Sequence, residues 1–379
     1  MRKAWLIVIV IIIVVSVIWL IWGRQNIEPS KIKIGVVLPL TGSASVWGEN
    51  AKMGMEIALE EINSQGGIKG KKIELIFEDS QSDPAKAVAA LQKLISIEKV
   101  PAVIGDIASS CVLAMAPIAE KAKVVLLSPG ASNPDISKAG EYIFRNWQSD
   151  ALEGEIDAKF AFKYLGYKRA AILYVNNAYG SGLKKVFEYS FNKLGGQILT
   201  SQSFDQGETD MRTQLNKIIL VNPDVIYMPG YPTEMAIVLK QAKEMGIKKQ
   251  FLSTQAFDDP KILELAKDAA EGVIFSVPKP PDPSDPVVRN FRNKYKARFK
   301  REPGVCSDTG YDAVKIIAWA MERVKRITGP AIQHQLLKLK NFPGAAGVTT
   351  FDQNGDVIKE FIFKKVKNQK FIPLEVEIK

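Results

Sequence analysis

Short apolar runs alternate with amphipathic segments along most of the chain, and small polar residues follow each run. The clearest example extends from Val103 to Pro134. Apolar residues at 100–104 lead into Gly105-Asp106, and Ser109-Ser110 then opens a segment with apolar residues at helical spacing. A second apolar run, Val124–Leu127, ends in Ser-Pro-Gly-Ala-Ser-Asn-Pro. The pattern predicts strand, helix and parallel strand, with a candidate ligand site where the strands end.

Ser109 stands where a helix N-cap is expected. In that position its hydroxyl and the free N–H groups of the first turn would face an anion. Equally, Ser109 and Ser132 could do no more than cap a helix and a turn. The two serines alone leave both alternatives open.

The alternation of strand and helix fills residues 32–150 and then begins again. In the first unit, strands are predicted at 31–40 and 71–80, and helices at about 49–63 and from 84 onward. In the second unit the predicted strands are 169–175, 196–204, 224–230 and 250–257, and the predicted helices are 153–165, 181–195, 211–220 and 235–246. Strands and helices at this spacing predict parallel sheets covered by helices on both faces. Two such units in succession predict two lobes.

The remainder of the chain joins these units. The proline-rich segment 276–286 is predicted to cross between the lobes rather than to form a core element. Helices are expected at about 287–300, 308–326 and 330–340. Residues 349–366 are predicted to form a hairpin that turns at Asn354-Gly355.

The N-terminus carries a 19-residue block without charge, Ala4–Trp22. As a helix it would span roughly 28 Å, close to the thickness of a bilayer's hydrocarbon core. It exceeds the usual signal-peptide core, and neither an A-x-A-like site nor a lipid-attachment cysteine follows it. We therefore expect residues 1–30 to be an uncleaved membrane anchor and linker, with the body outside the cytoplasm. A long signal peptide is the alternative.

The net charge of +10 does not by itself indicate nucleic acid. The densest basic run, 289–301, also carries Phe291, Tyr295 and Phe299 at every fourth position. This spacing predicts one buried aromatic stripe and a solvated basic face. We expect no nucleic-acid partner.

Motifs for catalysis or metal binding are lacking in the sequence. There is no G-x-S-x-G, P-loop or H-E-x-x-H pattern, and the lone His334 is expected at the surface. Cys111 and Cys306 fit no metal spacing. We therefore predict neither an enzyme nor a cofactor or metal site. Trp47, Tyr179 and Tyr231, expected in loops beside polar groups, suit a small amphiphilic ligand instead.

Several segments together carry a family resemblance: GGIKGKKIELIFEDSQSDPAKAV, VIGDIASS, LLSPGASNP, NNAYGSGL, MPGYPTEM and DAAEGV. Over about residues 31–363 the chain resembles the leucine/isoleucine/valine-binding proteins, the type I periplasmic solute-binding proteins of ABC importers. The resemblance implies two doubly wound parallel-sheet lobes that close on a ligand, joined by three hinge crossings. These crossings would fall near Asn146–Asp150, Ser276–Pro281 and Thr350–Gly355. The implied N-lobe is 31–148 plus 278–350, and the implied C-lobe is 149–277 plus 351–379.

The resemblance also implies a set of binding residues. Ser109 matches the family's carboxylate-binding serine, while Gly130 and Ser132, with Ala131 between them, match its strand-end contacts. The aromatic positions match Trp47, Tyr179 and Tyr231.

Two departures from the family pattern are apparent. Gln81 or Ser82 and Ala108 replace the family's disulfide cysteines, so that bridge is absent. Gln255 stands where the family has a glutamate for the ligand ammonium, and an amide brings no charge. Either Asp258 turns into the cleft as a substitute, which we favour, or the ligand is not a simple α-amino acid.

The sequence thus predicts a monomeric, membrane-anchored binding protein that delivers a small carboxylate-bearing solute to an ABC permease. An amino acid, branched-chain or otherwise hydrophobic, is the expected ligand. The alternatives are a sensor or receptor ectodomain, a binder of other carboxylates or amides, and an enzyme on a doubly wound fold.

Overall fold

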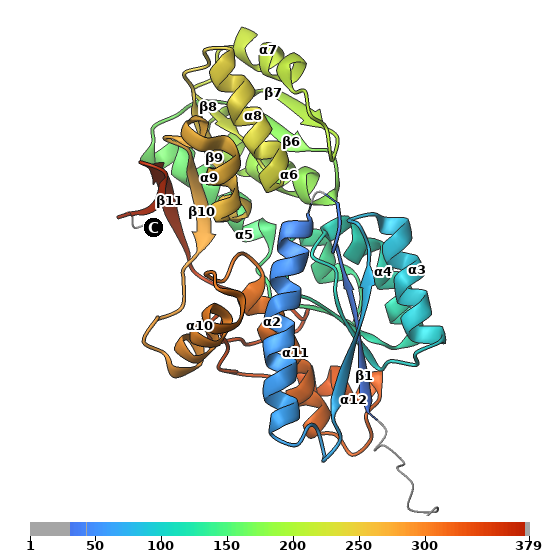
Figure 1. The fold of residues 1–379 in the computed structure, drawn as a ribbon. Coiled ribbons are helices and arrows are strands. Elements are labelled where there is room, and N and C mark those ends of the chain that lie inside the picture. Colours follow the sequence, from blue (N-terminus) through green and yellow to red (C-terminus); the bar gives the residue numbers. More distant parts are fainter. Residues whose placement is uncertain (1–30, 43, 376–379) are drawn as a thin grey trace, which may run out of the picture.

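The computed structural model describes residues 31–42 and 44–375, which form two α/β units, each built on its own sheet (Figure 1). The first sheet has the order β2-β1-β3-β4-β5, and every pairing in it is parallel. Its strands are β1 (Ile32–Leu38), β2 (Ile73–Asp79), β3 (Ala102–Gly105), β4 (Val125–Ser128) and β5 (Ile143–Arg145). The helices of this unit are α2 (Ser45–Ser64), α3 (Pro84–Ser96), α4 (Ser109–Ala122), α10 (Pro286–Phe299), α11 (Ser307–Glu322) and α12 (Gly329–Leu336).

Helices cover both faces of this sheet, as the continuous apolar runs predict. In β1, Ile34, Val36 and Leu38 join the core formed with α2 and α11. Val37 lies on the opposite face, in the core formed with α3 and α4. Successive strand residues point to opposite faces, so a strand covered on both sides must be apolar throughout.

The second sheet is mixed rather than purely parallel, which corrects the expectation of two parallel sheets. Its order is β12-β11-β10-β9-β8-β6-β7. Pairings from β10 to β7 are parallel, whereas β11 pairs antiparallel with both β10 and β12. Its strands are β6 (Arg169–Val175), β7 (Gln197–Phe204), β8 (Val225–Tyr227), β9 (Gln250–Ser253), β10 (Ile274–Pro278), β11 (Phe361–Lys367) and β12 (Lys370–Leu374). Its helices are α5 (Asp150–Lys159), which continues as a π-helical turn over Phe160–Tyr164, α6 (Ala178–Lys193), α7 (Arg212–Leu220), α8 (Pro232–Glu244) and α9 (Pro260–Ala266).

The predicted hairpin at Asn354-Gly355 is wrong. The strands that pair are β11 and β12, and their turn lies at Asn368 and Gln369, both with positive φ. At Asn354 the Asp352 side chain instead accepts hydrogen bonds from nearby backbone N–H groups and closes a local turn. The segments flanking that turn do not pair with each other: Thr349 pairs with Phe342, and Val357 with Gln148.

The chain passes between the two units three times: from β5 to α5, from β10 to α10, and from α12 to β11. The proline-rich segment is only partly a crossing, because Ser276, Val277 and Pro278 belong to β10. The first and third crossings run side by side, with Gln148 bridged to Val357.

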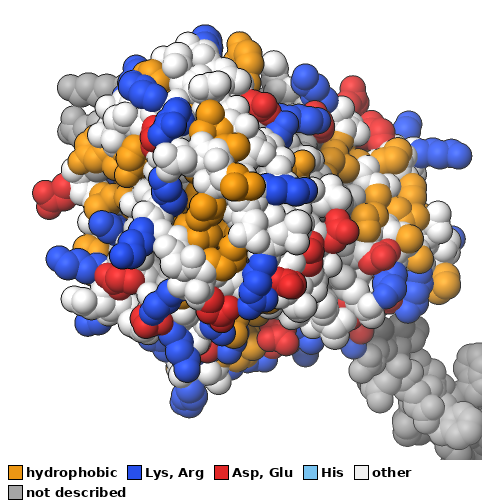
Figure 2. Space-filling model, turned by 90° about the horizontal axis from the view of Figure 1, so that it is seen from above, with side chains coloured by type: hydrophobic (Ala, Val, Ile, Leu, Met, Phe, Trp, Pro, Cys, Tyr) orange, Lys and Arg blue, Asp and Glu red, His pale blue; other side chains and the backbone are white. Residues whose placement is uncertain are grey.

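The basic helix α10 has the predicted two-sided character. Phe291 and Tyr295 are buried, while Arg298 forms ion pairs with Glu56 and Glu60 of α2. In the face shown in Figure 2, basic and acidic side chains are interspersed rather than gathered by sign. The charges of α10 thus serve its packing against α2.

The predicted anchor Ala4–Trp22 lies outside the described residues. Within 31–42 and 44–375, no helix is long and apolar enough to cross a membrane.

Glu61 of α2 is the charged group that ties α2 to α10 and α11. Its carboxylate accepts hydrogen bonds from Lys294 at 2.8 Å, Lys315 at 2.8 Å and Tyr311 at 2.6 Å. Burial alone would raise the pKa of Glu61, but these three donors outweigh it and lower the pKa from 4.5 to about 2.

We predict that Glu61→Gln lowers the free energy of unfolding by about 1–3 kcal/mol at pH 7, because three donors lose a charged acceptor. Because the pKa of Glu61 is lower in the folded than in the unfolded protein, its ionised carboxylate stabilises the fold fully at pH values above about 4.5. The difference in unfolding free energy between the variant and the parent should therefore shrink as pH falls from 4.5 towards 2. Urea unfolding at several pH values measures this. The control is Glu60→Gln, which removes only an exposed ion pair with Arg298. An equal effect from both variants would contradict the prediction.

Candidate functional site

The parallel strands of both sheets point their carboxyl ends towards one cavity between the two units. Its free interior is only about 20 Å³ in this arrangement, much smaller than a typical small-molecule site, so the lining side chains nearly fill it. Six predicted residues line it, all following strand ends: Trp47, Gly130, Ser132, Tyr179, Tyr231 and Gln255. The topology therefore brings together, from both units, side chains that are far apart in sequence.

Three aromatic side chains form one wall of the cavity. Trp47 meets Tyr231 edge to face, with ring centroids 5.2 Å apart, and Tyr231 stacks on Tyr179 at 5.7 Å. The Trp47–Tyr231 contact joins the two units directly. The expectation that these residues lie in loops is wrong for Trp47 and Tyr179, which lie in the first turns of α2 and α6, whereas Tyr231 is the loop residue that precedes α8 as its N-cap. For Trp47 the cause is that α2 begins at Ser45, before the apolar periodicity that placed its start near 49.

Hydrogen bonds hold the aromatic wall in place. The Tyr179 hydroxyl lies 2.8 Å from Thr254 Oγ1, and the Tyr231 hydroxyl accepts from Asn177 at 3.1 Å. In contrast, Trp47 Nε1 has no partner although it is buried. The wall therefore offers apolar surface with one free N–H donor.

The opposite wall is the loop after β4, which carries Gly130, Ala131 and Ser132. Ala131 is buried, and its N–H donates to Ser128 Oγ at 2.9 Å. A side chain at Gly130 would collide with Ile107, since its Cβ would lie 2.5 Å from Ile107 Cγ2. Because Gly130 has no side chain, its backbone is not covered by a Cβ on the side that faces the cavity.

Ser109 is not the N-cap that the sequence suggested. The N-cap is Ala108, whose side chain makes no capping bond, and Ser109 is the first residue of α4. The Ser109 oxygen instead accepts hydrogen bonds from the N–H groups of Ser132 and Asn133, each at 3.2 Å. Ser109 therefore fixes the loop that lines the cavity, and its own hydroxyl proton remains available to an acceptor.

Both the nitrogen and the oxygen of the Gln255 side-chain amide already form hydrogen bonds. Its Nε2 donates to Glu153 Oε2 at 2.9 Å, and its Oε1 accepts from Gln148 Nε2. The Gln255 backbone N–H also donates to Glu153 Oε1, at 2.6 Å. Asp258 does not line this cavity; its carboxylate is held by Lys364 Nζ at 2.7 Å and 2.8 Å.

A row of buried acids was missed by the sequence reasoning. Asp150, Glu153 and Asp157 follow one face of α5 at spacings of three and four, and all three are fully buried. The spacing D-x-x-E-x-x-x-D places them on one helix face, but this spacing does not distinguish a buried face from a solvated one. Trp147 and Cys306 also line the cavity without having been predicted to do so.

Burial raises the pKa of all three carboxyl groups, and repulsion from Glu153 raises it further for Asp150 and Asp157. For Glu153, hydrogen bonds from Gln255 and Ser276 oppose this, and its pKa is about 7. The pKa values of Asp150 and Asp157 lie well above their usual range. Because these pKa values are raised, the acids hold protons more strongly than usual, and a cation placed beside them would favour their ionised forms.

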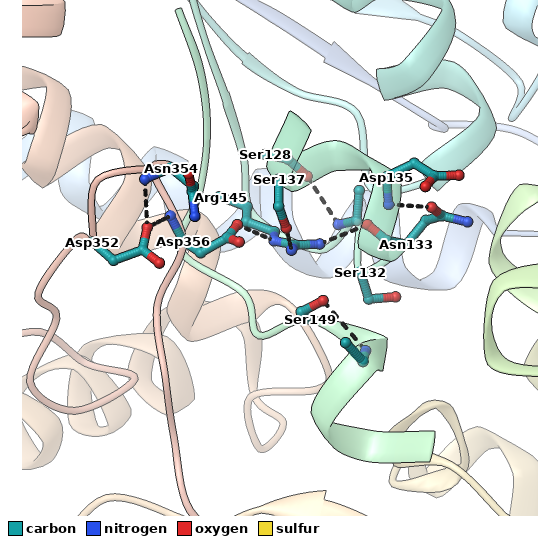
Figure 3. A network of polar contacts seen from close by, with 12 residues as sticks. Ser128, Ser132, Asn133, Asp135, Ser137, Arg145, Ser149, Asp352, Asn354 and Asp356 are labelled. Carbon is teal, nitrogen blue, oxygen red and sulfur yellow. Dashed lines mark hydrogen bonds and ion pairs between the residues drawn. The ribbon is translucent and has the colours of Figure 1, made fainter. Parts of the chain in front are cut away.

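A polar network around Arg145 anchors the crossings beside this site (Figure 3). The buried guanidinium donates to Asp356 Oδ1 at 2.6 Å, to the Asn133 carbonyl at 2.9 Å and to Ser137 Oγ at 2.6 Å. The first crossing, the third crossing and the loop after β4 are therefore joined through one side chain.

Comparisons with known proteins agree on one family. A family model described as periplasmic binding protein matches residues 31–370. The leucine-specific-binding protein of Salmonella typhimurium is 30% identical over 340 residues, which cover 89% of this chain and 91% of that protein.

Solved structures resemble the chain over a similar extent. The leucine binding protein of Thermotoga maritima is 34% identical, with a TM-score of 0.85, and the match covers 90% of this chain and 97% of that one. A branched-chain amino acid transporter substrate binding protein of Streptococcus pneumoniae, solved with isoleucine, is 29% identical with a TM-score of 0.83, covering 91% and 99%.

We predict that Ser109→Ala weakens both the fold and ligand binding. Two buried N–H groups lose their acceptor, which should lower the free energy of unfolding by about 1–3 kcal/mol. Loss of the loop's position and of the hydroxyl donor should reduce ligand affinity roughly 10- to 150-fold. Urea unfolding and calorimetric titration measure the two effects. Ser110→Ala, at a half-buried neighbour in the same helical turn, is the control, and parent-like behaviour of Ser109→Ala would exclude this role.

Proposed function

Because the chain belongs to the periplasmic binding protein family, we propose that it captures a small amino acid outside the cytoplasm and presents it to the permease of an ABC importer. The observation that carries this proposal is the cavity between the two units, with an aromatic wall on one side and a hydroxyl-bearing loop on the other. Polar groups at one end and apolar surface at the other suit an α-amino acid with a hydrophobic side chain.

Within this proposal the loop after β4 binds the ligand carboxylate. Ser132, the bare backbone at Gly130 and the hydroxyl proton of Ser109 are the groups at hand, with Trp47 Nε1 as a further free donor. The rings of Tyr179 and Tyr231 pack against the ligand side chain. The leucine and isoleucine binding of the relatives supports a branched-chain ligand.

Closure of the two lobes would be the signal to the permease. We propose that the lobes have the boundaries expected from the sequence. The two units touch through Trp47–Tyr231 and through Asn133 Nδ2, which donates to the Ala178 carbonyl at 2.5 Å. A ligand that contacts both lobes stabilises only the closed form and so shifts the population towards it. The body acts as a monomer in this scheme.

A second candidate ligand class follows from Gln255. Because the amide carries no charge and is already bonded at both ends, a carboxylic acid without an ammonium group could fill the same cavity. The buried acids of α5 favour the amino acid, because they would repel a second anion and attract a cation.

The ligand class is tested by calorimetric titration of the full chain in mild detergent. We expect saturable binding of leucine, valine or phenylalanine, at one ligand per chain, and weaker binding of benzoate and 2-ketoisocaproate. Binding of the two acids with no binding of any amino acid would overturn the proposed ligand class.

We further propose that Ala4–Trp22 anchors the body to the membrane. Its length and the absence of a cleavage motif support retention of the segment. N-terminal sequencing of the mature protein should therefore begin at Met1 or Arg2, and the protein should fractionate with membranes. A sequence that begins near Gln25 would identify a signal peptide instead.

A further inference from the structure

We propose that Asp150, the first residue of α5, is the counter-ion for the ammonium group of the bound ligand. This inference rests on the proposed function, because it assigns the cationic end of an amino acid within the same cavity. The position expected to supply an acid holds Gln255, and the expected substitute, Asp258, is bound to Lys364.

The three buried carboxylates of α5 differ sharply in how many donors they have. Glu153 accepts three hydrogen bonds, two from Gln255 and one from Ser276 Oγ at 2.8 Å. Asp157 accepts one, from the Tyr227 hydroxyl at 2.9 Å. Asp150 is fully buried, and neither of its oxygens has a hydrogen-bond partner. A buried carboxylate without donors is costly, so Asp150 is the acid that lacks a partner in this state.

Asp150 is not among the residues that line the cavity, but it lies next to one of them, Ser132. Its backbone N–H donates to the Ser132 carbonyl at 2.8 Å, which places the first turn of α5 against the lining loop. The Ser132 side chain lowers the pKa of Asp150, and the charge of Asp150 raises the pKa of Tyr179; both Ser132 and Tyr179 line the cavity. A ligand held against Ser132 therefore brings its polar end close to Asp150.

No basic side chain of the described chain neutralises this acid row. Arg145 is the nearest buried cation, and its guanidinium is committed to Asp356, Asn133 and Ser137. Among residues 31–42 and 44–375, no lysine or arginine forms an ion pair with Asp150, Glu153 or Asp157. An ammonium group from a ligand would supply both a positive charge that favours ionised Asp150 and the hydrogen-bond donors that Asp150 lacks.

The test compares ligands that differ only at their charged ends, titrated into the full chain in mild detergent. The ligands are leucine, 4-methylpentanoate, which lacks the ammonium, and isopentylamine, which lacks the carboxylate. Asp150→Asn keeps the shape of the side chain but removes its charge. We expect it to weaken leucine binding by about 10- to 150-fold and to leave 4-methylpentanoate unchanged or bound more tightly.

The matched control is Asp157→Asn, which removes an equally buried charge from the same helix face, two turns away. It should leave the preference for leucine over 4-methylpentanoate intact. Thermal unfolding without ligand separates binding from folding, because Asp150→Asn removes a buried carboxyl group whose oxygens have no hydrogen-bond partner and should not lower the melting temperature. Asp150→Ser, which also removes the charge, repeats the test if the asparagine variant does not fold.

A measurement on the unmutated protein adds an independent readout. An ammonium group stabilises the ionised form of Asp150, whose pKa burial has raised, so leucine binding should release protons and strengthen with rising pH. Titrations in two buffers of different ionisation enthalpy detect this release, which Asp150→Asn should diminish. The titratable and charged groups that interact with Asp150 come from its own helix and from β5 and α6: Glu153, Asp157, Arg145 and Tyr179.

The outcomes distinguish this inference from the proposed function. Leucine binding that is equally tight in Asp150→Asn, or an equal loss for leucine and 4-methylpentanoate, would overturn the role of Asp150 and leave the amino-acid binder standing. If the unmutated protein binds 4-methylpentanoate but neither leucine nor isopentylamine, the result contradicts the proposed ligand class. It then also contradicts the proposed role of Asp150 as a counter-ion.

Discussion

The arrangement of the two sheets is the constraint on which the rest of the structure depends. Both sheets direct the carboxyl ends of their parallel strands into the gap between the units, so the residues after β1, β4, β6, β8 and β9 converge on one cavity. A parallel strand must be followed by a turn into a helix, and these turns carry free N–H groups and small polar side chains. The position of the site therefore follows from the topology of the two sheets, and the side chains at the strand ends determine its detailed chemistry.

Much of this could be predicted from the sequence, because apolar runs and caps report local structure directly. Helix α3 begins at Pro84 as predicted, with Asp83 as its cap, and Gly130 and Ser132 reach the cavity because they follow a buried strand. The misplaced hairpin had a long-range cause: Asn354-Gly355 has the right turn residues, but its flanks pair elsewhere. The bond between Ser109 and the loop after β4 also joins residues more than twenty positions apart, which no local pattern encodes.

The acids of α5 were missed for a related reason. At i, i+3 and i+7 they resemble the solvated face of any amphipathic helix, and sequence alone gives no sign that this face is buried. Burial follows only from the way α5 packs, beside Tyr227 of β8 and Gln255 after β9. Local preference and tertiary packing conflict here, and such conflicts concentrate at functional sites.

The position of Asp150 also links recognition to motion. Asp150 opens α5 directly after the first crossing, and its backbone N–H bonds to Ser132 on the other unit. Arg145, at the start of the same crossing, fixes the third crossing through Asp356. A charge that binds Asp150 therefore acts on the segment about which the two units would move. Because the carboxylate lacks donors until a cation arrives, ligand capture and stabilisation of the closed arrangement would be one electrostatic event.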